Sequence, residues 1–451
     1  MKRIQSTQEL LSAVAAQPLE DAADEGDDRS SRVFMPKKVF CGVEGGGTTF
    51  RCALAEGDPT NITEVVSIAT TSPEETIGKV CAWLRSKGEF DGIGVASFGP
   101  VDLTRGSPTF GYITSTPKKG WNNVDLLGPI LEACPAGVAY EFDTDVNAPA
   151  MAEFTLGGLR QRGCTSCAYV TVGTGIGVGL VVNGQCVHGL LHPEAGHVPV
   201  PEPSDGDTFM GLQDRLVRRG AESMCCAGAL AARAGGTVVN GVRLDYDLKA
   251  SALRELPDDH YTFEKAAFYL ASLCVDLILI ASPERIVLSG GVMQRDSLFP
   301  AVRRNVQAIL NGYIQHPSIV EQVGIDAYIV PSQWKNDAGI IGALALGQLA
   351  LLKQKQATVM GVPGMSAPAD SRPDAEGYGF VQMTPQLLQG TEDKITMALE
   401  VMQQNLQAQI VELQKEVRKV EEVTPFLGVA RTVTLVAAAL AAGFGLARRM
   451  S

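Results

Sequence analysis

The chain has 451 residues, of which 45% are hydrophobic, and this is enough for two or three domains with cores of their own. The net charge of -12 and the pI of about 5.0 repel phosphate polyanions, so composition gives no support for a nucleic-acid-binding protein. The ten cysteines stand mostly in apolar runs and include no metal-type pair of CxxC units, which indicates buried thiols in a reducing compartment.

The first segment, residues 1–37, is acidic. A short apolar stretch is followed by an acidic tract from Glu20 to Asp28, which fits neither a secretory signal nor an organelle presequence. We expect a flexible arm, too short and too acidic to be a helix-turn-helix DNA reader.

Two glycine turns follow, each between apolar runs that predict strands. The first turn, Gly45-Gly-Gly-Thr48, lies within residues 39–54, and the second, Gly173-Thr-Gly175, lies within residues 168–182. Glycine turns let the backbone present N–H groups to a phosphate. Because the same design occurs twice, the sequence predicts an internal duplication with two phosphate-binding turns.

Between the turns, residues 92–102 read as a buried strand that opens into a loop. The loop 116–121 carries Lys118 and Trp121, a cationic and aromatic content that suits a ligand rim, although either segment can be merely structural.

Two polar clusters flank the second turn. The first, Asp143-Thr-Asp145-Val-Asn147, places a carboxylate beside an amide; Asp145 is either a general base or the N-cap of the helix that follows. The second, His192-Pro-Glu194-Ala-Gly-His197, offers a Glu/His pair for hydroxyl groups. A base, a phosphate cradle and hydroxyl anchors are what sugar phosphorylation needs.

The last elements of this region are two helices and a strand. A helix over 266–282 leads into a strand at 285–289, after which small residues at 290–293 would let a flat purine approach the backbone. A final helix over 336–352 has a glycine and alanine face that permits close packing and closes the core.

The order of these motifs over residues 38–350 resembles the fructokinases of the ROK sugar-kinase family. Seven motifs in a fixed order make the resemblance specific, whereas a single one would not. It implies an α/β, actin-like ATPase (ribonuclease H-like) fold with an N-terminal lobe at 38–150, a C-terminal lobe at 151–335 and a cleft where ATP and sugar meet.

The resemblance also implies roles for individual residues. Asp145 is the general base, and the sugar is bound by Asn147, Glu194 and His197, with Lys118 and Trp121 at the rim; a buried, satisfied histidine is the alternative for His197. His188 and His192 are interpreted as loop residues. ATP is bound by Glu44, Gly45, Gly46, Gly47, Thr48, Thr171, Gly173, Thr174, Gly175, Gly228, Gly290, Gly291, Val292 and Met293. Mg²⁺ enters with ATP, positioned by Glu44.

Two departures from the family pattern stand out. Thr49 replaces the lysine that follows the threonine of the first turn, which removes a positive charge near the phosphates and predicts lower activity. The family's zinc site uses a histidine, matched by His197, and three cysteines, two of whose positions are held here by Gln213 and Gly220. Adjacent Cys225 and Cys226 cannot easily complete a tetrahedral site, so we expect no structural zinc.

The resemblance ends near residue 352. Residues 353–385 are rich in Pro, Gly, Ala, Ser and Gln and predict a linker. Residues 386–422 hold apolar positions at spacings of three and four, which predicts an amphipathic helix, either solvated or self-associating as a coiled coil. Residues 426–447 are uncharged except for Arg431 and, at about 1.5 Å per residue, just reach across a hydrocarbon core. A C-terminal tail anchor is favoured over a buried or dimerising helix.

These features together predict a membrane-tethered kinase, a homodimer, that transfers phosphate from ATP to a hexose, with D-fructose and fructose 6-phosphate as the favoured pair. The kinase lobes face the cytosol, and the mitochondrial outer membrane is favoured over the peroxisome or plastid envelope. The alternatives are a glucokinase or N-acyl-hexosamine kinase of the same family, and a weakly catalytic sugar sensor or scaffold. A transcriptional repressor would need a basic DNA-reading domain, which the acidic arm does not supply.

Overall fold

The computed structural model describes residues 37–212, 217, 219–235, 238–239, 242–243 and 250–360. The predicted arm up to residue 36, the predicted helix at 386–422 and the predicted membrane segment at 426–447 lie outside these residues. Within the described ranges, no helix has both the length and the apolar character that crossing a bilayer requires.

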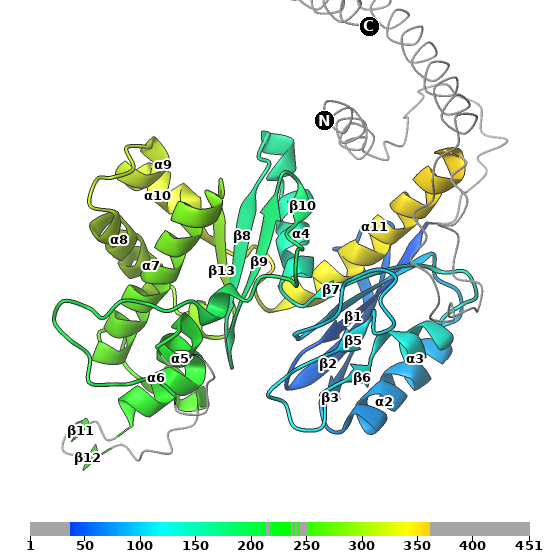
Figure 1. Cartoon of the computed structure of the whole chain (residues 1–451), viewed down its shortest axis with the longest axis horizontal. Coiled ribbons are helices and arrows are strands. Elements are labelled where there is room, and N and C mark those ends of the chain that lie inside the picture. The colour runs from blue at the N-terminus through cyan, green and yellow to red at the C-terminus, as the bar shows by residue number, and fades with distance from the viewer. Residues whose placement is uncertain are drawn as a thin grey trace, which may run out of the picture. The chain divides into compact units, whose positions relative to one another are not determined.

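The first of two five-stranded sheets, drawn in blue to cyan in Figure 1, follows the order β3-β2-β1-β4-β7. Strands β1 and β2 form the predicted antiparallel hairpin around the first glycine turn, while β4 and β7 run parallel to β1. Strand β4 is buried along its whole length, as expected of a central parallel strand. The strands are β1 (Val39–Gly45), β2 (Thr49–Glu56), β3 (Ile62–Ala69), β4 (Gly92–Ser97) and β7 (Ala139–Thr144).

The second sheet repeats this arrangement in the order β10-β9-β8-β13-β14. Strands β8 and β9 again form an antiparallel hairpin around a glycine turn, and β13 and β14 run parallel to β8. The predicted internal duplication is therefore confirmed at the level of sheet topology. The strands are β8 (Cys167–Val172), β9 (Ile176–Val182), β10 (Gln185–Cys186), β13 (Ile286–Ser289) and β14 (Ile329–Pro331).

Helices cover both sheets and connect their parallel strands. The α-helices are α2 (Pro73–Arg85), α3 (Leu127–Glu132), α4 (Asn147–Thr155), α5 (Ala221–Cys225), α6 (Ala227–Ala234), α7 (Tyr261–Ala281), α8 (Leu298–Leu310), α9 (Pro317–Val320), α10 (Gln322–Tyr328) and α11 (Ala338–Met360). The short 3₁₀ turns are η1 (Arg160–Arg162), η2 (Ala195–His197), η3 (Ala250–Glu255), η4 (Val292–Gln294) and η5 (Lys335–Asp337). Two small ladders pair β5 (Tyr112–Ile113) with β6 (Val124–Asp125) and β11 (Val238–Val239) with β12 (Val242–Arg243).

Helix α2 shows how local sequence sets these boundaries. The Ser72 hydroxyl accepts a hydrogen bond from the Glu75 N–H, and Pro73 opens the first turn, where its missing N–H costs nothing. Its apolar face, which includes Ile77, Val80 and Leu84, is buried in the core of the first sheet.

Helix α11 packs so closely on the first sheet that only glycine fits beneath it. A Cβ at Gly94 would lie 1.9 Å from the Ala343 carbonyl oxygen, and one at Gly92 would lie 2.4 Å from that of Gly347. The same helix contacts α4, which packs on β8 and β9 of the second sheet. This is the close packing predicted from the glycine and alanine face.

The end of α11 differs from the sequence prediction. A linker was expected from residue 353, but the helix runs on to Met360. The physical reason is composition, because residues 353–358 consist mostly of lysine, glutamine and alanine, which are good helix formers.

Candidate active site

The first glycine turn connects β1 to β2 and is held from both sides. The Gly46 N–H donates to the Thr49 carbonyl at 3.1 Å, and the Thr70 hydroxyl donates to the Gly46 carbonyl at 2.8 Å. A Cβ at Gly45 would lie 2.9 Å from the Phe50 ring, whereas at Gly47 it would meet no atom within 4 Å. Gly45 and Gly46 therefore serve close packing, whereas Gly47 and Thr48 are exposed and leave room for the predicted phosphate.

The second glycine turn connects β8 to β9 and depends on a residue that sequence analysis missed. The Gly173 N–H donates to the Gly175 carbonyl at 2.8 Å, and the Ile176 N–H donates to Glu222 Oε2 at 2.9 Å. A Cβ at Gly175 would lie 2.4 Å from that same carboxylate oxygen. Glu222, on α5, thus fixes the turn from a distant part of the chain.

The flanks of this turn hold the other residues predicted to bind phosphate. Thr171 lies on β8, and the Thr174 side chain is exposed at the tip. The Ala227 N–H at the start of α6 donates to the Gly173 carbonyl at 2.8 Å, which brings the neighbouring Gly228 close to the turn.

Asp145 lies directly after β7, where the chain leaves the first sheet. Its N–H donates to the Ser97 carbonyl at 2.9 Å, which fixes the backbone beside β4. The side chain does not cap α4: the N-cap residue is Val146, and the Thr144 hydroxyl accepts the hydrogen bond from the Asn147 N–H. The capping alternative is therefore wrong, because the Asp145 carboxylate makes no capping hydrogen bond to the N–H groups of α4.

The electrostatics of Asp145 suit a general base. Burial raises the pKa of its carboxyl to about 7, and the negative charges of Glu44 and Glu194 add to the effect. A carboxylate with a pKa near the working pH is ionised in a large fraction of molecules, yet binds a proton strongly.

Glu44 lies at the end of β1, opposite Arg51 of β2. Burial raises its pKa to about 7, while the Arg51 guanidinium, whose Nη1 lies 3.7 Å from Glu44 Oε2, opposes the shift. Oε2 is buried and accepts no hydrogen bond from the described part of the protein. A buried, orphaned carboxylate oxygen at a phosphate turn fits the predicted place beside a hydrated cation.

Arg51 was not singled out from the sequence. Its Nη2 donates to Asp337 Oδ1 at 2.7 Å, and its Nη1 donates to the Asn336 carbonyl at 3.0 Å, so it ties β2 to the turn before α11. The Asn336 side chain in turn accepts a hydrogen bond from Gln294 at 2.6 Å. A chain of polar contacts therefore joins the first glycine turn to η4.

The turn at η4 is where the sequence placed the purine. Gly290 has a φ of 94°, which favours glycine, and a Cβ there would lie 2.5 Å from the Val172 carbonyl oxygen. Gly291 meets no atom within 4 Å, Val292 is half-buried and Met293 is buried. An exposed glycine beside apolar side chains remains suited to a flat ring, and the purine site stays a prediction.

Asn147 is buried at the first turn of α4. Its Nδ2 donates to Asp143 Oδ1 at 2.8 Å, and His188 Nε2 lies 3.0 Å from Asp143 Oδ2. The hydrogen bond to Asp143 raises the pKa of His188. Asn147 Oδ1 is enclosed and accepts no hydrogen bond within the described residues. The contact of Asn147 with sugar stays a prediction. His188, which was interpreted as a loop residue, also contacts Asp143 and so helps to fix the Asn147 side chain.

The Glu/His pair lies at η2. Glu194 is partly exposed, and its Oε2 lies 3.8 Å from His197 Nε2, while its Oε1 lies 3.4 Å from His192 Nδ1. His197 is half-buried, so it is not the fully buried histidine of the alternative. Partial enclosure raises the pKa of Glu194 against the opposing effect of both histidines.

His192, interpreted from the sequence as a loop residue, is buried and makes a long-range contact. Its Nε2 accepts a hydrogen bond from the Val101 N–H at 3.1 Å. The segment after β4 is thereby joined to the loop that carries Glu194, so His192 positions the Glu/His pair.

Lys118 and Trp121 share a loop, but the structure separates them. The Lys118 ammonium donates a hydrogen bond to the Gly47 carbonyl at 2.5 Å, which places it at the first glycine turn. The Trp121 ring is fully buried, and its Nε1 donates to the Thr71 carbonyl at 2.9 Å. The structure therefore places Trp121 in the core and not at a ligand rim, because its large apolar surface packs against Phe50 and Phe98.

Comparison with known proteins identifies the family. The ROK family profile matches residues 40–349. A fructokinase from Zymomonas mobilis is 39% identical over 329 residues, which are 70% of this chain and 98% of that protein. The chain belongs to the ROK family. A putative fructokinase from Bacillus subtilis is 37% identical over 312 residues, which are 69% of this chain and 95% of that protein.

Solved structures agree on the fold. The ROK hexokinase from Thermus thermophilus has a TM-score of 0.51 at 21% identity and covers 70% of this chain and 99% of its own. The predicted α/β fold is thus confirmed, and the ROK fructokinase relatives confirm the predicted enzyme class, a sugar kinase.

The region of the family's zinc site has a different character in this ROK protein. Within the described residues, no group of three or more His, Cys, Asp or Glu side chains could hold a metal ion; Gln213 is not among those residues. Gly220 precedes α5, while Cys225 and Cys226 are fully buried, and the Cys225 thiol donates to the Ala221 carbonyl at 3.1 Å. The expectation that no structural zinc is bound stays a prediction.

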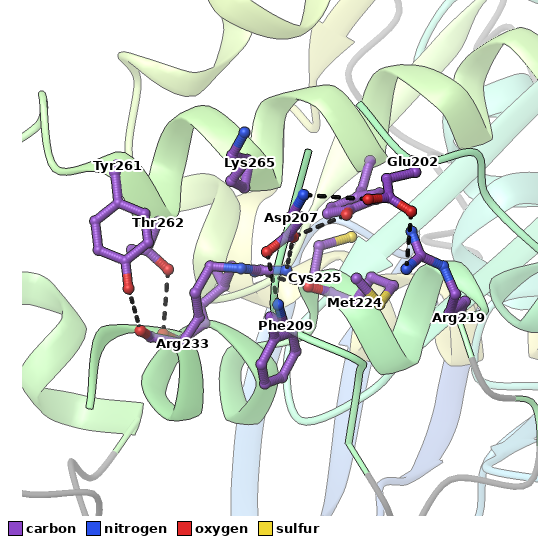
Figure 2. Close-up of polar contacts among 12 residues, drawn as sticks. Glu202, Asp207, Phe209, Arg219, Met224, Cys225, Arg233, Tyr261, Thr262 and Lys265 are labelled. Carbon is purple, nitrogen blue, oxygen red and sulfur yellow. Dashed lines mark hydrogen bonds and ion pairs between the residues drawn. The ribbon is translucent and has the colours of Figure 1, made fainter. Parts of the chain in front are cut away.

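A buried ion pair lies in the same segment (Figure 2). Arg233 Nη2 lies 3.0 Å from Asp207 Oδ2, with both side chains almost inaccessible to solvent. The Tyr269 hydroxyl donates to the same carboxylate at 2.8 Å, and Arg233 Nη1 donates to the Met224 carbonyl at 2.9 Å. The Phe209 ring lies 4.5 Å from the guanidinium carbon. These contacts fasten residues 207–209 to helices α5, α6 and α7.

Proposed function

We propose that this protein is an ATP-dependent fructokinase that converts D-fructose to fructose 6-phosphate. The observation that carries the proposal is the Asp145 carboxylate, which has a pKa of about 7 and is electrostatically coupled to Glu44 at the first glycine turn and to Glu194 of the Glu/His pair. A proton acceptor within electrostatic reach of a phosphate turn and of a hydroxyl anchor is what a sugar kinase needs. The two fructokinase relatives at 39% and 37% identity support fructose as the sugar.

The reaction assigns a step to each part. Asp145 takes the proton of the sugar hydroxyl as its oxygen attacks the γ-phosphorus. The phosphates are held by those backbone N–H groups of the two glycine turns that the turns' own hydrogen bonds do not use, and Glu194 and His197 bind sugar hydroxyls. Because phosphoryl transfer is mostly positioning and charge neutralisation, this set suffices when the nucleotide arrives with its cation.

Mg²⁺ is the cation that ATP brings. Glu44 fits it, because one buried carboxylate oxygen of this residue has no hydrogen-bond partner in the described structure. Mg²⁺ would neutralise charge on the phosphates, and Glu44 would hold one of its water ligands.

The test is ADP release by the purified full-length protein with ATP and Mg²⁺ over a panel of fructose, glucose, mannose and N-acetylated hexosamines. The proposal expects fructose to have the highest kcat/KM. A glucokinase from Halalkalibacterium halodurans at 26% identity keeps glucose as the second candidate. Absence of turnover with every sugar, together with intact nucleotide binding, would instead favour the weakly catalytic sensor, for which Thr49 is the supporting observation.

We also propose that residues 426–447 tether the kinase to a membrane, with the lobes in the cytosol and the mitochondrial outer membrane as the favoured site. The support is a mostly apolar segment that is uncharged except for Arg431 and is followed by two arginines. A fluorescent fusion to residues 386–451 is expected to coat an organelle and resist carbonate extraction, and truncation after Thr424 is expected to give a soluble enzyme. A soluble full-length protein would refute the tether. Light scattering on the truncated enzyme tests the proposed homodimer.

A further inference from the structure

Lys118 is the cation that directly contacts the first glycine turn in the described part of the chain. Its ammonium donates a hydrogen bond to the carbonyl of Gly47, the turn residue that has open space above it. The side chain is half-buried, and it forms no ion pair with any described carboxylate. Its positive charge is therefore held at the turn without a negative partner.

The loop that carries Lys118 is anchored to the same segment as the turn itself. Trp121 stacks on Phe50 with ring centroids 5.6 Å apart, and its Nε1 donates to the Thr71 carbonyl. The neighbouring Thr70 donates through its hydroxyl to Gly46 and through its N–H to Thr48 at 3.0 Å. Because residues 70–71 hold both the turn and the loop, Lys118 is fixed beside the turn by a rigid scaffold. This is the role of the buried Trp121.

Among the described residues, a second cation near this turn, Arg51, is already neutralised. Arg51 pairs with Asp337 at 2.7 Å and lies 3.7 Å from Glu44, so two carboxylates share its charge. Thr49, which follows the turn, is uncharged. Phosphoryl transfer spreads negative charge over the oxygens of the transferred group, and stabilisation of that charge by fixed cations is a major part of catalysis.

We propose that Lys118 is a catalytic residue that binds an oxygen of the γ-phosphoryl group, both in bound ATP and during its transfer. This inference rests on the proposed kinase function and reassigns Lys118 from the sugar to the nucleotide. The sugar oxygen forms a bond to the γ-phosphorus, and the bond from that phosphorus to the β–γ bridging oxygen breaks. Its electron pair stays on ADP, the hydroxyl proton passes to Asp145, and Lys118 keeps its protons throughout. In the free enzyme the Lys118 ammonium donates its hydrogen bond to the Gly47 carbonyl.

The adjacent Lys119 offers a matched control. It is exposed and forms no hydrogen bond or ion pair with the turn among the described residues, and its replacement changes the net charge by the same amount. The test compares Lys118→Met, Lys118→Arg and Lys119→Met in the full-length protein. Steady-state kinetics gives kcat and KM. Calorimetric titration with ATP and with ADP, in the presence of Mg²⁺ and without sugar, gives the affinity for each nucleotide.

Lys118→Met is expected to lower kcat about 10²–10³-fold, as removal of one transition-state hydrogen-bond donor does elsewhere. The KM for fructose should stay within about twofold, and the preference for ATP over ADP in calorimetry should fall. Lys118→Arg should recover part of kcat, because it retains the charge, and Lys119→Met should match the wild type.

Two results would overturn the proposal. One is a Lys118→Met enzyme with unchanged kcat and a raised KM for fructose, which would return Lys118 to the sugar site. The other is an unchanged ATP-to-ADP preference in Lys118→Met. If the wild type phosphorylates no sugar at all, the kinase function fails, but the two titrations still decide whether Lys118 contacts the γ-phosphate.

Discussion

Replacing Asp145 by asparagine should weaken catalysis and strengthen the fold at the same time. The substitution removes the proton acceptor, and general-base catalysis is worth about 10²–10⁴-fold in kcat. It also removes a carboxylate whose ionised form the folded protein disfavours, because its pKa rises from 3.8 to about 7. At about 1.4 kcal/mol per unit, this shift sets a ceiling of about 4 kcal/mol on the gain in stability.

The sign of this gain follows from proton binding. The folded protein holds the proton on Asp145 more tightly than the unfolded chain, so the wild type loses stability as pH rises from about 4 to about 7. Because the repulsion from Glu44 and Glu194 depends on their own ionisation, we expect about 1–2 kcal/mol for Asp145→Asn at pH 8.5 and clearly less at pH 5.5.

The assay is urea unfolding of the wild type and Asp145→Asn at both pH values, with kcat measured on the same preparations. Glu153→Gln is a matched control, because burial raises the pKa of Glu153 to about 7 as well, and its carboxylate accepts a hydrogen bond from Ser332, which is not among the predicted site residues. The gain in stability of Glu153→Gln over the wild type should also be larger at the higher pH, while its kcat stays at the wild-type value. A gain for Asp145→Asn that is equal at the two pH values, or a kcat above a tenth of the wild type, would refute the reasoning.

Four further outcomes are expected. The kcat/KM for fructose should fall as pH drops below about 7, because Asp145 and Glu44 take up protons there; a profile that is flat from about pH 5 to 8 would contradict the assigned base. Arg51→Met should raise the KM for ATP about tenfold and leave the KM for fructose unchanged, since it releases Glu44 and the turn before α11; steady-state kinetics with each substrate varied checks this. Arg233→Met should lower the free energy of unfolding by about 3–5 kcal/mol, because it leaves Asp207 buried and unpaired, without changing kcat; urea unfolding beside the kinetic assay measures both. Elemental analysis of the purified protein should find far less than one zinc per chain, and about one per chain would show that Cys225 or Cys226 is a ligand by a route the described residues do not reveal.

Sequence alone predicted the features that depend on residues close together in the chain. Each glycine turn, with apolar runs on both sides, specifies its own hairpin, and the repetition of the pattern predicted the internal duplication that the two sheets show. The glycines under α11 follow the same logic, since a helix face of glycine and alanine needs a partner surface without side chains.

The residues that sequence missed act through long-range contacts. Glu222 holds the second turn from α5, and His192 joins the Glu194 loop to Val101, but neither contact has a signature in the neighbouring sequence. The same limit applies to Trp121, because an aromatic residue in a polar loop suits a ligand rim and a core anchor equally well until Phe50 is placed beside it.

The central claim is that this ROK protein transfers the γ-phosphate of ATP to fructose. Phosphorus NMR of the product formed from fructose, ATP and Mg²⁺ by the full-length enzyme, with Asp145→Asn as the control, tests it most directly. The account predicts a single phosphomonoester that matches fructose 6-phosphate, formed in step with ADP and absent from the control. A product at another position, or a phosphate ester formed from glucose and not from fructose, would contradict it.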